Sequence, residues 1–86
     1  MQINSKPIII EGIDRLLGLM PGCIVIGIKR VSEGILGQPG QIEELQILYR
    51  DGTEERISII EMTTAETFVK ICSMIATHAA ITGEGQ

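Results

Sequence analysis

The sequence predicts an α+β fold with the element order α-β-β-β-α: a three-stranded antiparallel meander with both helices packed on one face. Three observations lead to this fold class. Apolar residues recur at helical spacing near both ends of the chain, they alternate at strand spacing in its middle, and glycine-containing turns separate the alternating runs. The length of 86 residues predicts a single domain over residues 1–86. A small SH3-like barrel with terminal helices is the alternative fold.

The first helix is expected at about residues 8–19. Its apolar positions at helical spacing are Ile9, Ile13, Leu16, Leu17 and Met20. The preceding segment, residues 4–7, offers Asn and Ser as capping side chains and a proline that the first helical turn tolerates. Pro21-Gly22 ends the helix. Three consecutive β-branched residues at 8–10 leave a short strand open as an alternative for that part.

The first strand is expected over residues 23–33, and its first half is apolar on both faces. One face carries Ile24, Ile26 and Ile28, and the other carries Cys23, Val25 and Gly27. Such a strand is expected to be covered on both sides and to lie in the centre of its sheet. The same pattern keeps the barrel alternative open.

Residues 34–41, with the sequence GILGQPGQ, are expected to form a wide hairpin loop, because three glycines and one proline in eight residues hold neither a helix nor a strand. Ile35 and Leu36 are large aliphatic residues inside this loop. They either fold back onto the sheet as a lid or stay exposed as a contact for a partner.

The second strand is expected over residues 42–49, where apolar and polar residues alternate. The third strand is expected over residues 53–62, with Ile57 and Ile59 pointing inward. One face of this hairpin is therefore expected to be buried and the other to be solvated.

The turn between these strands follows from the same alternation. A two-residue turn would place the isoleucines of the third strand on the wrong face. A three-residue loop, residues 50–52 with Gly52 in the left-handed conformation, pairs Leu45 with Ile57 and keeps the apolar face continuous. We therefore predict the three-residue loop.

The second helix is expected over residues 64–80, and Thr63 and Glu66 match the capping box that opens a helix. Residues 81–86 are expected to fray. Apolar residues cover more of this helix than a single stripe. They surround a seam formed by Ala65, Phe68, Cys72, Ile75 and Ala79.

This helix carries more apolar surface than one small sheet face covers, and helices that are apolar nearly all round are buried nearly all round. Either both helices pack together on one sheet face, or a second copy of the chain covers the surplus in a two-fold dimer. The candidate dimer face consists of Ala76, Ala79 and Ala80.

Composition argues against several classes of function. The net charge is −4, from eleven acidic and seven basic residues, and basic residues are not clustered as nucleic-acid binding requires. No apolar run reaches the length of a membrane helix, so no membrane partner is expected. Cys23 and Cys72 lie in apolar runs without a secretory segment before them, which predicts buried, reduced thiols in a cytoplasmic protein.

No constellation for catalysis, metal binding or cofactor binding is recognisable, so the chain is not expected to be an enzyme. His78 is the only histidine, and it is expected near a helix C-terminus, where a positive charge is favourable. Glu11 and Asp14 are expected on the solvated face of the first helix.

Three hypotheses for function remain. The first is a non-catalytic, homodimeric protein–protein interaction module. The second is an acidic regulator that binds a basic protein through Glu44 and Glu54, together with Glu43 and Glu55. The third is a carrier or enzyme for a small apolar ligand, with a pocket under the loop at residues 34–41.

Overall fold

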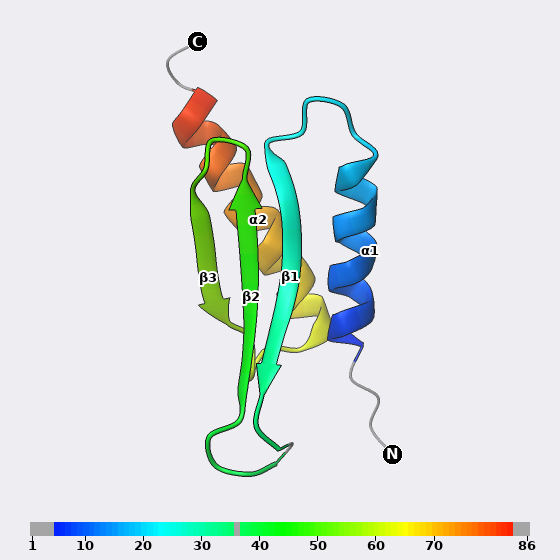
Figure 1. The fold of residues 1–86 in the computed structure, drawn as a ribbon, viewed down its shortest axis with the longest axis vertical. Coiled ribbons are helices and arrows are strands. Elements are labelled where there is room, and N and C mark those ends of the chain that lie inside the picture. The colour runs from blue at the N-terminus through cyan, green and yellow to red at the C-terminus, as the bar shows by residue number, and fades with distance from the viewer. Residues whose placement is uncertain (1–4, 36, 84–86) are drawn as a thin grey trace.

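The computed structural model describes residues 5–35 and 37–83, and it confirms the predicted element order. The elements are α1 (Lys6–Gly18), β1 (Val25–Glu33), β2 (Ile42–Tyr49), β3 (Glu54–Ser58) and α2 (Thr64–Gly83). The strands form an open antiparallel sheet in the order β1-β2-β3, so the barrel alternative is wrong. Both helices lie on one side of the sheet, α2 crossing behind it and α1 running beside β1 (Figure 1). None of the helices in the described residues has the length and hydropathy needed to cross a bilayer.

Helix α1 starts earlier than predicted, and a different interaction stabilises its first turn. The helix begins at Lys6, two residues before the expected start, and Pro7 lies in its first turn. The residues at 8–10 are helical, which excludes the short strand there. Ser5 is the N-cap residue, but its side chain donates and accepts no capping hydrogen bond, so a side-chain cap at Ser5 is wrong. The ammonium group of Lys6 holds this end instead, because it donates a hydrogen bond of 2.9 Å to the carbonyl of Ile59.

Strand β1 corrects two expectations, its alternation and its central position. A β-bulge lies between Val25 and Gly27, so Val25 and Ile28 are both buried whereas Ile26 is 56% exposed. The extra residue of a bulge shifts every following side chain to the other face. Strand β2 is central, and β1 lies at an edge of the sheet.

Helix α1 covers part of this edge. The carboxylate of Asp14 accepts a hydrogen bond of 2.8 Å from the backbone N–H of Ile28. An edge strand presents unpaired backbone groups to solvent unless another element satisfies them. Asp14 is therefore half-buried and has a structural partner, and its expected place on a solvated face is wrong.

The β2–β3 hairpin confirms the predicted loop and register. Leu45 pairs with Ile57, the N–H of Tyr49 donates to the carbonyl of Thr53 at 2.9 Å, and Gly52 has a φ of +92°. Strand β3 ends at Ser58, before the expected end at residue 62, because the chain turns toward α2. In that turn the N–H of Met62 donates to the carbonyl of Ile59.

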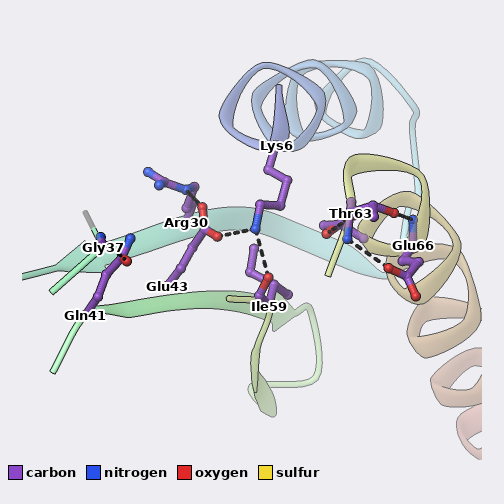
Figure 2. A network of polar contacts seen from close by, with 9 residues as sticks. Lys6, Arg30, Gly37, Gln41, Glu43, Ile59, Thr63 and Glu66 are labelled. Carbon is purple, nitrogen blue, oxygen red and sulfur yellow. Dashed lines mark hydrogen bonds and ion pairs between the residues drawn. The ribbon is translucent and has the colours of Figure 1, made fainter. Parts of the chain in front are cut away.

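The capping box at the start of α2 is confirmed. The N–H of Thr63 donates to the carboxylate of Glu66 at 2.9 Å, and the N–H of Glu66 donates to the hydroxyl of Thr63 at 3.1 Å (Figure 2). The helix continues to Gly83, so residues 81–83 are helical where fraying was expected. The remainder of that expected tail, residues 84–86, lies outside the described residues.

The core lies between the sheet and the two helices. Its buried apolar residues are Ile10, Val25, Ile28, Leu45, Ile47, Tyr49, Ile59, Ile71 and Met74. Helix α2 therefore contributes Ile71 and Met74, together with the buried Thr67, and not the predicted seam. Of that seam only Ile75 packs against the core. Thr67 is tolerated inside because its hydroxyl donates to the carbonyl of Thr63 at 2.9 Å.

Candidate interaction surface

The side of α2 that faces away from the sheet is apolar and exposed. We call it the α2 outer face, and it consists of Ala65, Phe68, Val69, Cys72, Ala76, Ala79 and Ala80. Residues three and four positions apart lie on one side of a helix, and this set lies opposite Thr67, Ile71 and Met74. Phe68 is 47% exposed and Val69 is 63% exposed. The three alanines proposed from the sequence as a dimer face all belong to this exposed set.

A polar strip borders the α2 outer face along one side of the helix. It consists of Glu66, Lys70, Ser73 and Thr77, all of them exposed. An open hollow of about 450 Å³ lies along this border, lined by apolar residues such as Met62 and Val69 and by the first three residues of the polar strip. The apolar area therefore has a defined limit on this side and is not scattered over the whole helix.

Helix α1 and the two residues that follow it also expose large apolar side chains. We call these the α1 stripe, and they are Ile8 at 67%, Leu16 at 60%, Leu19 at 80% and Met20 at 51% exposure. Gly12 lies among them along the helix, and its Cα has open space around it. Because α1 and α2 share one side of the sheet, the stripe and the α2 outer face belong to the same helical layer (Figure 1).

The loop candidate is exposed where it can be described. Ile35 is 71% exposed, so it does not fold back onto the sheet as a lid, and Leu36 lies outside the described residues. The loop is closed by a hydrogen bond of 3.1 Å from the N–H of Gly37 to the side-chain carbonyl of Gln41 (Figure 2). Gly34 permits this closure, because a Cβ at its φ of +88° would lie 3.0 Å from the Cα of Gln41.

The acidic candidates divide between the surface and the interior. Glu44 and Glu54 lie on the open sheet face, where Glu44 accepts a hydrogen bond from Gln46 and Glu54 pairs with Arg56. Glu43 is only 3% exposed, so its place in an acidic contact surface is wrong. Glu55 likewise has an internal partner, because its carboxylate accepts a hydrogen bond from the hydroxyl of Tyr49.

Glu43 is the centre of a buried ionic cluster. One carboxylate oxygen pairs with Lys6, and the other lies 2.6 Å from the Nε of Arg30 (Figure 2). The side chains of Lys6 and Glu43 are 10% and 4% exposed. The cluster joins α1, β1 and β2, and Lys6 extends it to Ile59. Sequence reasoning missed this cluster, although Glu43 lies two residues before the buried Leu45 in the same strand and therefore points to the same face.

His78 lies inside a second polar cluster. Its ring stacks on Tyr49 with centroids 3.6 Å apart, and its Nε2 lies 3.0 Å from Asp51. Hydrogen bonds from the hydroxyl and the N–H of Thr53 lower the pKa of Asp51 to about 2, with a smaller effect from His78. Burial and the neighbouring Glu55 raise the pKa of Tyr49. His78 thus fastens α2 to the β2–β3 turn, a role that the sequence did not indicate.

The cysteines occupy different environments. Cys72 is exposed on the α2 outer face, which overturns its expected burial, whereas Cys23 is half-buried and packs against the core. Both are free thiols. Within residues 5–35 and 37–83, no three His, Cys, Asp or Glu side chains come together as metal ligands.

Comparisons with known proteins do not place the chain in a family: no family model, no curated protein sequence and no solved structure gave a significant match. The function is therefore argued from the surfaces of the chain alone.

Proposed function

We propose that the protein is a small, non-catalytic homodimeric module for protein–protein interaction, and that its contact surface is the α2 outer face. The observation that carries this proposal is the continuous exposed apolar side of α2, opposite the side that packs on the sheet. A helix that is apolar on both sides is normally covered on both sides. Within the described residues, α1 lies beside β1 and leaves the α2 outer face exposed.

The position of the apolar surfaces favours a second copy of the chain as the partner. A stable complex buries about 800 Å² of each partner. The α2 outer face and the α1 stripe lie on the two helices of one layer, and we expect the contact to include both. A two-fold dimer covers both surfaces with one contact, because each chain presents the same patch to the other.

The alternatives have less support. An acidic surface for a basic partner keeps only Glu44 and Glu54, since Glu43 and Glu55 have internal partners. Hollows lie beside α2, on the open sheet face and beside α1, and none of these is lined by residues of the loop at 34–41, so they do not favour an apolar ligand under that loop. The free thiols of Cys23 and Cys72 fit a reducing compartment such as the cytoplasm.

Light scattering after size exclusion tests the proposal over a dilution series. We expect twice the mass of the chain at tens of micromolar and a fall toward the monomer mass on dilution. A monomer mass at every concentration up to hundreds of micromolar would exclude the homodimer. A larger, unlimited mass would also count against it, because an isologous contact closes at two subunits.

A further inference from the structure

Building on the proposed homodimer, we infer that α2 pairs antiparallel with α2 of the second copy, about a two-fold axis that passes beside Cys72. Phe68 and Val69 of one chain then rest on Ala76 and Ala79 of the other. The inference names the partner surface residue by residue, and it stands on the size, charge and position of side chains along the helix.

The size of the side chains changes along the α2 outer face. Its N-terminal half carries the large Phe68 and Val69, and its C-terminal half carries only small residues, Ala76, Ala79 and Ala80. An antiparallel pair sets each large half on a small half, so the helix axes keep an even separation of about 8–10 Å. A parallel pair sets large on large and small on small, which leaves a wedge-shaped gap at the alanine end.

The position of the axis follows from the spacing. In a two-fold antiparallel pair, each residue meets a residue equally far from the axis on the other side. Phe68 with Ala76, and Ala65 with Ala79, both have their midpoint at Cys72. The thiol of Cys72 therefore faces Cys72 of the second copy.

The charges at the border are compatible with this register. The polar strip of one chain runs beside the strip of the other in the reverse direction. Glu66 then lies near Thr77 of the second copy, and Lys70 lies near Ser73. Each charged residue of the strip therefore lies nearest an uncharged one, and the two Lys70 residues are offset from each other by about 6 Å along the helix pair.

The position of α1 also favours the antiparallel arrangement. A two-fold axis that runs across α2 keeps both copies of α1 on the same side of the helix pair, so the two α1 stripes lie beside each other. An axis along α2 places the two copies of α1 on opposite sides, where Leu16 and Leu19 stay exposed on each chain. The first arrangement therefore covers more of the exposed apolar surface than the second, as a stable dimer requires.

Disulfide mapping tests the register directly. In a background of Cys23→Ala and Cys72→Ala, the single variants Val69→Cys and Ala76→Cys are mixed and oxidised with diamide. Two thiols then lose two protons and two electrons to diamide and form one disulfide. We expect the mixed 69–76 disulfide to form at least tenfold faster than either like-with-like disulfide, because like residues lie about 10 Å apart along the antiparallel pair.

The native thiol supplies the second readout. In the Cys23→Ala variant, the two Cys72 residues of a dimer should form a disulfide at least tenfold faster than the two residues at position 76 do in the Ala76→Cys variant. Faster 69–69 and 76–76 disulfides, or no preference among the pairs, would overturn the antiparallel register while a dimer mass leaves the proposed function intact. A monomer mass for the same variants and for the native chain would overturn both.

Discussion

Glu43 places a carboxylate in the interior between two cations, with its side chain 4% exposed. Moving charges out of water is unfavourable, so the carboxylate and the cations depend on each other. Removing Glu43 leaves both cations charged and takes away the carboxylate that they share. The cluster also links the first turn of α1 to β1 and β2, which fixes how the helix meets the sheet.

Glu43→Gln should therefore lower the free energy of unfolding by about 3–5 kcal/mol, because it leaves Lys6 and Arg30 without the carboxylate. Glu11→Gln is the matched control, since Glu11 forms an exposed pair with Arg15 that contributes about 0.5 kcal/mol or less. Urea denaturation of both variants measures the difference. Equal losses in the two variants would show that the buried cluster has no special energetic role.

The carboxyl of Asp51 gives a pH-dependent prediction. Its pKa is lowered from 3.8 to about 2, chiefly by the hydroxyl of Thr53. A lowered native pKa contributes stability that is fully present above the unfolded pKa, near pH 4, and is lost as the pH falls toward 2. Thr53→Val should raise the Asp51 pKa toward its ordinary value.

A carboxyl-carbon NMR titration of Asp51 measures this shift. The backbone N–H of Thr53 and the imidazole of His78 remain in the variant, so we expect the pKa to stop short of 3.8. Ser32→Ala, which also removes an exposed hydroxyl but lies at the other end of the sheet where Ser32 pairs with Glu43, should leave the titration unchanged. An Asp51 midpoint that is the same in native protein and Thr53→Val would contradict the assigned cause.

Several residues have roles in the structure that their residue type does not indicate. Lys6 is a buried cation at a helix start, Thr67 is a buried polar residue, and Cys72 is an exposed thiol within an apolar run. Each depends on a partner far along the chain or on the exact rotation of a helix, which single-sequence periodicity does not fix. Asp51 lies in the turn that the strand alternation predicts at residues 50–52, and its hydrogen-bond partner Thr53 is only two residues away.

At the scale of elements, the β2–β3 hairpin was predictable and β1 was not. The hairpin combines a strict alternation with a turn whose length the alternation decides. Strand β1 contains the bulge at Val25 and Gly27, and its apolar residues give no sign of which one is extra. The rotation of α2 was missed for a similar reason, since nearly every side of the helix is apolar enough to be the buried one.

The predicted turn makes Gly52 and Gly12 respond oppositely to the same substitution. Gly52→Ala should destabilise the protein by about 1–2 kcal/mol, because φ is +92° there and a Cβ clashes with the backbone in that conformation. Gly12→Ala should stabilise it by about 0.5–1 kcal/mol, since Gly12 is an exposed helical residue with open space around it.

Both glycine variants should be measured in an Ala76→Glu background, so that self-association through the helical layer does not contribute. Thermal or urea unfolding gives the two free energies. Effects of the same sign at Gly52 and Gly12 would contradict the left-handed turn or the open helix position.

At the scale of the whole molecule, the two broad surfaces differ in their chemistry. The open sheet face mixes apolar residues such as Ile26 and Leu48 with charged residues such as Lys29 and Glu54, around a hollow of about 320 Å³. A face with this mixture of apolar and charged residues is compatible with exposure to solvent. The α2 outer face carries no charged residue, and the α1 stripe adds exposed apolar residues on the other helix of the same layer. We therefore propose the helical side as the surface that a second copy covers.

The most direct test of this account compares the dimer affinity of Ala76→Glu and Thr77→Glu by sedimentation equilibrium. The two substitutions add the same charge to neighbouring exposed positions, one on the α2 outer face and one on the polar strip. We predict that Ala76→Glu weakens the dimer by about a hundredfold or more, because two-fold symmetry buries two uncompensated carboxylates. Thr77→Glu should weaken the dimer by only about tenfold or less, because its carboxylate stays in water at the border and its repulsion from Glu66 of the second copy is screened by salt. Equal affinities for the two variants, or a native chain that is monomeric throughout, would contradict the account.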